Sequence, residues 1–561
     1  MRLSLIFVLI FTSLINGQNN YPQDYFTSPL EIPLILSGTF AELRSNHFHS
    51  GLDIKTQGRQ GLKVLSVADG FISRIKIAHF GYGKALYITH PNGYTSVYGH
   101  LQSFSPEIEA YIKAQQYKAE SFEIELFPTA ETLPVTKGQH VAYSGNTGGS
   151  GGPHLHFEIR NKEEHPLNPM LFGIDIKDTT KPYVRSIYVY PLGENAGVNN
   201  SNKKQALRLI PLSNGDYTTE NIEAFGKIGF GIETNDRLDM ASNSNGVHNI
   251  ETSINGTKNF EIDFKEFSFD ETLFINQLID YNHFNNTKRR IQKLFRVNNP
   301  LSLYKNPVND GFLNIADSTS SVYKIHVSDF KKNVTTVLIN IKGTKSASVK
   351  TDPKKTTPYL ISANQKTTLK AENVTVNFAP DTFYEDFYID FEVSNDTLKL
   401  HEDVIPTKKP FEINFDINPY KGEDRDKLFI AKLIGRKNYP VYCTTTKKDH
   451  NLSTSTKVLG TYTLATDTKS PTIYAPNFND GQWISNYRYL TVKIADDLSG
   501  ISSYRATING QWILMEYDYK TKTLTYDFND HNITDTKNIL KLIVTDNVGN
   551  SSTFESVFYR K

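Results

Sequence analysis

Residues 144–160 read SGNTGGSGGPHLHFEIR, and this stretch decides the fold of the first part of the chain. A glycine-rich run ends at Pro153, and polar and apolar residues then alternate, which predicts a tight turn leading into a β-strand. Side chains two residues apart in a strand point to the same face. His154 and His156 are therefore expected to present two imidazoles on one side of a sheet.

A second histidine motif, HSGLD, occupies residues 49–53. His49 and Asp53 supply an imidazole and a carboxylate, and Gly51 between them allows the chain to turn tightly. Two imidazoles and one carboxylate, with one position left for water, form the ligand set of a catalytic zinc site. His47 lies outside the H-x-G-x-D spacing, so we expect it on a groove wall or on the surface.

The composition narrows the possible chemistry. Nine of the 15 histidines fall between residues 47 and 165, and the chain has one cysteine, Cys443, so histidine is the expected soft ligand. The formal net charge of the 561 residues is +1, so the chain has no large net positive charge with which to attract nucleic acid. Strand-like alternation dominates the sequence, and helical periodicity is confined to a few stretches, among them 105–117 and 271–295.

Three motifs occur in the order HSGLD, YGHL (98–101) and SGNTGGSGGPHLHFEIR. In them, residues 35–169 resemble the lysostaphin-type (LytM-like) zinc endopeptidases, which cut the peptide part of bacterial cell walls. The resemblance implies a compact antiparallel sheet with one zinc ion per chain in a groove open at both ends. By this resemblance, the three zinc ligands are His49, Asp53 and His156. The two catalytic histidines are His100 and His154.

Two segments depart from the family pattern. Family members often carry a tyrosine a few residues before the first ligand, whereas residues 41–46 of this chain read AELRSN. Arg44 and Asn46 are the predicted substrate-binding residues. Residues 102–134 form a segment longer than a simple hairpin connection. The sequence does not decide whether this segment is a lid over the groove, a wall of the groove or an excursion away from it.

The N-terminus predicts export. Residues 1–17 combine Arg2 with an apolar run of about twelve residues, which is shorter than the ~20 needed to span a bilayer. We expect a cleaved signal peptide, with an uncleaved anchor as the alternative, and a mature chain without a membrane span. The expected location is the periplasm or cell envelope, or the medium after secretion.

The rest of the chain predicts β-sandwich modules. D-T-x-x-P occurs at residues 178–182 and 467–471, I-N-G at 254–256 and 508–510, and V-x-D with a later asparagine at 327–333 and 544–550. Three matched landmarks in one order indicate two copies of one module. The predicted organisation is mainly β, with a LytM-like domain and about three Ig-like β-sandwich modules, at 18–177, 178–345 with a helical insertion, 346–466 and 467–561.

Two pairs of aspartates raise the question of calcium in these modules, namely Asp236 with Asp239 and Asp496 with Asp497. Neither pair belongs to a complete oxygen-ligand pattern such as an EF-hand loop. The sequence therefore favours solvated strand ends at both places.

Two functional hypotheses follow. The first is an exported zinc endopeptidase that hydrolyses peptide bonds in peptidoglycan stem peptides or cross-links through a zinc-activated water. The second is a non-catalytic cell-envelope scaffold that recognises peptidoglycan through the LytM-like domain. In either case the β-sandwich modules are expected to dock to an envelope protein or a glycan. The complete set of five metal and catalytic residues favours the enzyme.

Overall fold

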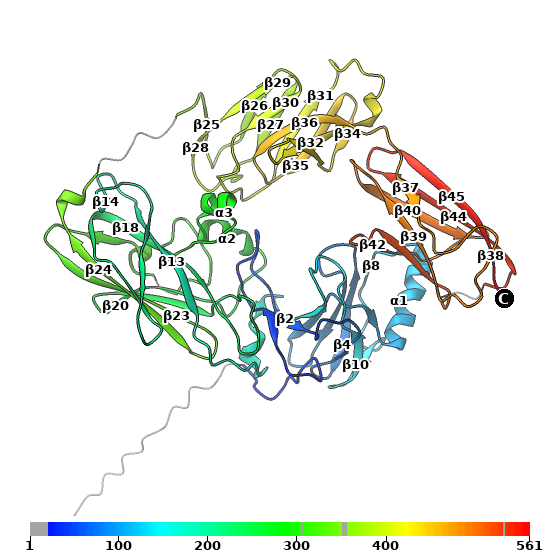
Figure 1. Ribbon diagram of the computed structural model, residues 1–561, viewed down its shortest axis with the longest axis horizontal. Coiled ribbons are helices and arrows are strands. Elements are labelled where there is room, and N and C mark those ends of the chain that lie inside the picture. Colours follow the sequence, from blue (N-terminus) through cyan, green and yellow to red (C-terminus); the bar gives the residue numbers. More distant parts are fainter. Residues whose placement is uncertain (1–20, 306, 350–355, 531–532) are drawn as a thin grey trace, which may run out of the picture.

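The computed structural model describes residues 21–305, 307–349, 356–530 and 533–561, so the predicted export segment at 1–17 lies outside the described residues. Four β-rich parts follow one another around a ring, and the last part returns to lie beside the first (Figure 1). The predicted mainly β fold is confirmed. Among the described residues, no helix is both long enough and apolar enough to cross a membrane.

A nine-stranded antiparallel sheet forms the first part of the chain. Its strand order is β1-β2-β11-β6-β5-β4-β8, with β12 beside β11 and β9 beside β4. The bounds are β1 (Leu36–Gly38), β2 (Leu52–Lys55), β4 (Gly70–Ile77), β5 (Lys84–Thr89), β6 (Thr95–Gly99), β8 (Ile124–Leu126), β9 (Pro134–Val135), β11 (His154–Arg160) and β12 (Pro166–Leu167). In β11 the side chains of Leu155, Phe157 and Ile159 are fully buried in the core, which leaves the alternate residues for the other face.

The segment 102–134 contains the helix α1 (Pro106–Ala119), which confirms the predicted helix there. Proline in the first turn and Glu120 with a left-handed φ of 46° mark its two ends. Ile108 and Ile112 are buried in the core. A small sheet has the order β3 (Lys63–Leu65), β10 (His140–Tyr143) and β7 (Ser103–Phe104), and its strand β7 belongs to this segment.

A twelve-stranded sheet follows, with the main order β15-β13-β18-β24-β23-β19-β20. Its strands are β13 (Tyr183–Pro191), β14 (Gly197–Val198), β15 (Gln205–Leu207), β16 (Leu209–Pro211), β17 (Tyr217–Thr219), β18 (Ile222–Asn235), β19 (Asn249–Ile254), β20 (Thr257–Asp263), β21 (Gln292–Lys293), β22 (Leu313–Ile315), β23 (Ser320–Ser328) and β24 (Val334–Gly343). We call residues 178–345 the first module.

The predicted helical stretch at 271–295 is broken into short pieces. A 3₁₀ turn (Thr272–Phe274) leads into α2 (Ile275–Leu278), and α3 (Tyr281–Thr287) follows. Ile279 between the two helices is extended, and the Asp280 side chain caps α3 by accepting the His283 N–H. The cap begins a new helix and thus ends the continuous periodicity that the sequence indicated.

The third part contains three small sheets. They are β25 (Tyr359–Ile361) with β28 (Phe387–Ile389); then β26 (Thr367–Ala371), β27 (Val374–Phe378), β31 (Phe411–Asp416), β35 (Asn451–Thr456) and β34 (Thr446–Lys448); and β29 (Phe391–Ser394), β30 (Thr397–Leu400), β36 (Gly460–Thr466), β32 (Leu428–Ile434) and β33 (Tyr439–Tyr442).

Two sheets form the last part, residues 467–561, which we call the C-terminal module. One holds β37 (Thr472–Tyr474), β39 (Tyr489–Ala495), β43 (Thr523–Asp527) and β42 (Glu516–Asp518), and the other holds β38 (Gln482–Trp483), β45 (Ser551–Tyr559), β44 (Lys537–Asp546), β40 (Ile501–Ile508) and β41 (Gln511–Trp512). The matched I-N-G landmarks are both hairpin turns, because Asn255, Gly256, Asn509 and Gly510 all have φ between 50° and 83°.

One continuous hydrophobic core extends from the nine-stranded sheet of the first part into the first module. Phe40 and Phe48 pack against Phe267 with ring centroids 5.3 Å apart in each pair. The Phe48 N–H also donates to Thr272 Oγ1 at 2.8 Å. Phe40 and Phe48 are thus buried against residues of the first module.

We therefore expect a chain cut after residue 176 to be less stable than a chain cut after residue 345. The shorter chain exposes Phe40 and Phe48, and each exposed aromatic side chain forfeits about 1.5–3 kcal/mol of burial. Thermal unfolding of chains 18–176 and 18–345 measures the difference. Equal melting temperatures for the two chains would contradict a shared core.

Candidate metal and catalytic centre

The central strand β11 aligns the histidines with the acidic motif. It pairs with β2 on one side, where His156 is opposite Asp53, and with β6 on the other, where His156 is opposite Gly99. His100 follows directly after β6 and has a left-handed φ of 58°. Three strands that are distant in sequence thus bring their polar side chains to one face of the sheet.

Gly51 is required by the close approach of β11. A Cβ atom at this position would lie 2.2 Å from the carbonyl oxygen of Phe157, a distance that no side chain tolerates. The glycine in HSGLD therefore lets the chain enter β2 directly against β11, which fixes the register between Asp53 and His156.

Three ligand atoms converge in this register. His49 Nε2 lies 2.9 Å from Asp53 Oδ1 and 3.1 Å from His156 Nδ1, and His156 Nδ1 lies 2.9 Å from Asp53 Oδ1. Ligands at 2.0–2.1 Å from a tetrahedral zinc would be about 3.3 Å apart. The three atoms are therefore spaced as ligands of one metal ion.

The tautomers of the two imidazoles point their lone pairs at this centre. His49 Nδ1 donates to the Thr39 carbonyl at 2.7 Å, and His156 Nε2 donates to Glu158 Oε1 at 2.8 Å. The opposite nitrogens, His49 Nε2 and His156 Nδ1, then lie against each other and a carboxylate oxygen, an arrangement that needs a proton or a metal ion between them. The residues present fit zinc.

Glu158 is fully buried and organises the far side of His156. It accepts hydrogen bonds from Ser50 Oγ at 2.6 Å, from Arg160 Nε at 2.6 Å and from the Tyr82 hydroxyl. The Tyr82 ring stacks on His156 with centroids 4.9 Å apart. Carboxylates in this position fix the orientation of a ligating histidine and raise its basicity.

The electrostatics of the pocket favour positive charge at the ligand cluster. Burial lowers the pKa of His156, but its hydrogen bonds to Asp53 and Glu158 outweigh burial and raise that pKa to about 9. Burial also raises the pKa of Asp53, but the surrounding histidines hold it well below its usual range. The ligand cluster therefore attracts a proton or a metal ion.

His100 and His154 lie beside the ligand cluster with ring centroids 4.8 Å apart. His100 Nδ1 donates to the Thr147 carbonyl and His154 Nδ1 to the Gly152 carbonyl, each at 2.8 Å. Their Nε2 atoms are thus free to accept a proton, and that of His154 lies 3.4 Å from Asp53 Oδ1. Burial and the two neighbouring imidazoles lower the pKa of His100 to about 3, so this ring is neutral.

The two predicted substrate-binding residues differ in position. Arg44 lines the groove and its Nη2 donates to Asp53 Oδ2 at 2.9 Å, so it is tied to a ligand of the centre. Asn46 is exposed, its Oδ1 accepts from Asn276 of the first module at 2.9 Å, and it is not part of the groove lining. His47 is exposed on the groove wall.

The centre lies in a groove of about 910 Å³ whose walls come from more than one part of the chain. Phe269 and Thr272 of the first module line it. At another edge the groove residue Phe80 contacts Tyr519 of the C-terminal module, with ring centroids 4.9 Å apart. Of the described residues that line the groove, none belongs to the segment 102–134.

The segment 102–134 instead supports the C-terminal module. Tyr117 of α1 packs against Trp512 with centroids 5.3 Å apart, and Glu120 forms a 2.6 Å ion pair with Arg505. Lys84 of β5 is buried, and both carboxylate oxygens of Glu516 lie within 2.9 Å of its ammonium group. These contacts close the ring seen in Figure 1.

Sequence reasoning missed Glu158, Tyr82 and Thr39 as supports of the centre. A signal for Glu158 existed, because it stands two residues after His156 in the same strand and therefore shares its face. Tyr82 and Thr39 reach the ligands from loops, and no local pattern reports such a contact.

Two protein-family models match parts of the chain. Residues 47–125 and 123–169 match Peptidase family M23, and residues 358–467 match a Zu5-like domain. The "DD-carboxypeptidase/endopeptidase Mpg" of Neisseria meningitidis serogroup B is 30% identical over 139 residues, which cover 25% of this chain and 26% of that protein. A protein of Haemophilus influenzae described as an "Uncharacterized metalloprotease" is 32% identical over 127 residues, 22% of each chain.

Solved structures match a similar share of this chain. A mutant catalytic domain of the prophage-encoded M23 protein EnpA from Enterococcus faecalis has 21% identity and a TM-score of 0.19, and the match covers 27% of this chain and 97% of that one. The catalytic domain of lysostaphin from Staphylococcus simulans has 20% identity and a TM-score of 0.18, and the match covers 24% and 87%. The family match identifies an M23 peptidase domain at residues 47–169, and the chain spans about a quarter of the length of the curated relatives it matches.

We predict that His49→Ala and His156→Ala each abolish stoichiometric zinc binding by the full chain, because each removes one of three protein ligands. The control is His47→Ala, which changes a nearby exposed histidine and should keep one zinc per chain. Metal analysis after dialysis gives the stoichiometry. One zinc per chain in either ligand variant would contradict the assignment.

Proposed function

We propose that this chain is an exported zinc metalloendopeptidase that hydrolyses peptide bonds in peptidoglycan stem peptides or cross-links. The observation that carries the proposal is the convergence of His49 Nε2, Asp53 Oδ1 and His156 Nδ1 at the base of an open groove. The M23 relatives, one named as a carboxypeptidase and endopeptidase, support the substrate class.

The residues divide the chemistry between ligation and proton transfer. Zinc, when bound, supplies a water with a pKa near ~7 and polarises the peptide carbonyl. His100 and His154 each direct an acceptor Nε2 into the groove, so either ring can take a proton from the attacking water. The other ring, once protonated, can stabilise the oxyanion or protonate the leaving amine.

Arg44 has a positioning role in this proposal. Its guanidinium binds Asp53 Oδ2 and leaves Oδ1 directed at the two ligating nitrogens. Asp53 would therefore offer one oxygen to zinc, and a coordination position would remain for water.

Export rests on the sequence of residues 1–17, and a cell-envelope location follows from the proposed substrate. The near-zero net charge argues against long-range attraction of the modules to an anionic polymer. We also propose that the modules dock to an envelope protein or a glycan. The alternative to the enzyme is a scaffold that recognises peptidoglycan without cleaving it. The intact ligand and histidine set favours hydrolysis.

Digestion of purified peptidoglycan by the full chain tests the activity, with products read by mass spectrometry. We expect new peptide termini, which a chelator prevents and added zinc restores. His100→Ala and His154→Ala should retain one zinc and lose activity by about 10²–10⁴-fold, the usual size of an acid–base contribution. Absence of cleavage by the zinc-loaded wild type would favour the scaffold, and zinc loss in His154→Ala with retention in His156→Ala would reverse their roles.

The contact between the C-terminal module and the groove edge generates a separate prediction. Tyr519 donates to the Gly148 carbonyl at 3.0 Å, and Lys520 Nζ donates to the Asn146 carbonyl at 2.5 Å. We expect this contact to restrict the access of a bulky substrate beside Phe80, so a Tyr519→Ala, Lys520→Ala double variant should gain activity on polymeric peptidoglycan more than on soluble muropeptides. Tyr439→Ala, an exposed tyrosine of the third part, is the control. Equal changes on both substrates would contradict a steric role.

A further inference from the structure

Three aspartates of the first module meet at one point, away from the catalytic groove. Asp178 precedes β13, Asp236 follows β18 and Asp329 follows β23, and one carboxylate oxygen of each lies within 4.8 Å of the others. The expectation of a solvated strand end is wrong for Asp236, which is only 2% exposed. Asp239, which the sequence paired with it, instead accepts hydrogen bonds from Thr179 and Thr180.

Two oxygens of this cluster are buried and unpaired. Asp236 Oδ1 and Asp178 Oδ2 have no hydrogen-bond partner among the described residues, and Asp178 is only 9% exposed. Among the residues that the structure describes, no lysine or arginine forms an ion pair with any of the three carboxylates. Lys331, which lines the same cavity, pairs with Asp175 at 3.2 Å. Buried carboxylates without a partner cost several kcal/mol unless they are neutralised.

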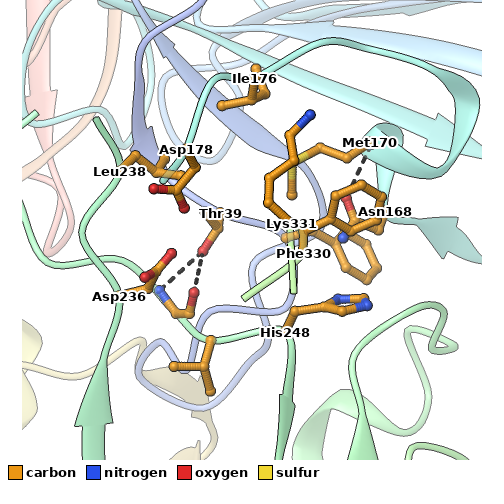
Figure 2. Close-up of a pocket in the computed structure, with 13 residues that line it drawn as sticks. Thr39, Asn168, Met170, Ile176, Asp178, Asp236, Leu238, His248, Phe330 and Lys331 are labelled. Atoms are coloured by element: carbon orange, nitrogen blue, oxygen red, sulfur yellow. Dashed lines mark hydrogen bonds between the residues drawn. The ribbon is translucent and has the colours of Figure 1, made fainter. Parts of the chain in front are cut away.

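The unpaired oxygens face a small cavity between the peptidase domain and the first module. The cavity measures about 20 Å³, enough for one ion or water, and Thr39, Asp178, Asp236 and Lys331 contribute to its lining together with apolar side chains. Figure 2 shows the carboxyl groups of Asp178 and Asp236 on the same side of it, next to Thr39. Burial, followed by repulsion from Asp178 and Asp329, raises the pKa of Asp236 to about 8, so the cluster without a cation retains protons.

The C-terminal module provides an internal comparison. Asp467, Asp496 and Asp546 form the matching group there, and each of its carboxylates is engaged by the backbone. Asp467 accepts the N–H groups of Lys469 and Ser499, and Asp496 Oδ2 accepts those of Leu498 and Gly500. The turn after Asp236 supplies no such hydrogen bonds to its Oδ1.

Asp329 and Asp546, in contrast, are bound alike in the two modules. Each accepts the backbone N–H and the side-chain amide of an asparagine four residues later, Asn333 and Asn550 respectively, at 2.7–2.9 Å. The scaffold of the two clusters is therefore shared, and the difference lies in the unpaired oxygens of Asp178 and Asp236.

We propose that Asp178, Asp236 and Asp329 bind one calcium ion at the junction of the peptidase domain and the first module. The three carboxylates form a hard oxygen site in which each residue offers one oxygen to the ion. Calcium accepts oxygen ligands, backbone carbonyls among them, in flexible geometry, whereas magnesium demands a near-ideal octahedron.

The position of the site connects it to the catalytic centre. Asp236 and Asn245 exchange backbone hydrogen bonds at 2.8–2.9 Å, and the next residue, Gly246, exchanges two with Thr39 Oγ1 at 3.0–3.1 Å. The Thr39 carbonyl in turn orients His49. Calcium would thus fix the loop that holds one proposed zinc ligand in place.

The test uses the full chain loaded with one equivalent of zinc in calcium-free buffer, and it does not depend on peptidase activity. Calcium chloride is titrated calorimetrically, and thermal unfolding is followed in parallel. We expect one calcium per chain and a rise of about 5 °C in the melting temperature of the first transition at 100-fold excess over Kd. Asp236→Asn should weaken binding at least tenfold, and the matched control Asp496→Asn should bind as the wild type does.

Asparagine has the shape of a protonated aspartate, so Asp236→Asn should fold, and Asp178→Asn supplies the same comparison if it does not. The proposal is overturned if the wild type binds no calcium, if both Asp178→Asn and Asp236→Asn bind it unchanged, or if Asp496→Asn abolishes binding. Magnesium binding of equal strength in the same titration would overturn the assignment to calcium.

Discussion

The pairing of β2 with β11 is the constraint on which the centre depends. It sets Asp53 opposite His156, and the absence of a side chain at Gly51 permits that register. A shift of one residue would turn His154 and His156 into the core and expose Leu155 and Phe157, because the side-chain period of a strand is two. Hydrophobic burial on one face of β11 therefore fixes the position of the ligands on the other.

The hydrogen bonds around His49 and His156 determine which ring nitrogen of each imidazole faces the proposed metal site. The Thr39 carbonyl accepts a hydrogen bond from His49 Nδ1 and Glu158 accepts one from His156 Nε2, so His49 Nε2 and His156 Nδ1 are turned toward that site. Thr39 is itself held by the first module, and Glu158 by Arg160. The modules are thus not simple spacers, since one of them supports a ligand and another closes against the groove edge.

The sequence predicted the centre better than it predicted its surroundings. The H-x-G-x-D and H-x-H spacings are local, so the alternation of a strand and one glycine sufficed to identify the converging residues, while their roles as ligands and bases stay predictions. Asn46, by contrast, was chosen from its place in the sequence and faces Asn276 instead of the groove. The aspartate cluster was not predictable, because Asp178, Asp236 and Asp329 meet only through the topology of β13, β18 and β23.

The central claim is that two imidazoles and one carboxylate hold a catalytic zinc. A crystal structure of the zinc-loaded full chain, with anomalous diffraction measured at the zinc absorption edge, tests it most directly. We expect a single strong peak within about 2.0–2.2 Å of His49 Nε2, His156 Nδ1 and Asp53 Oδ1, with a fourth position open to solvent. A peak coordinated by His100 and His154 in place of His49 and His156, or a site closed by a fourth protein ligand, would contradict it.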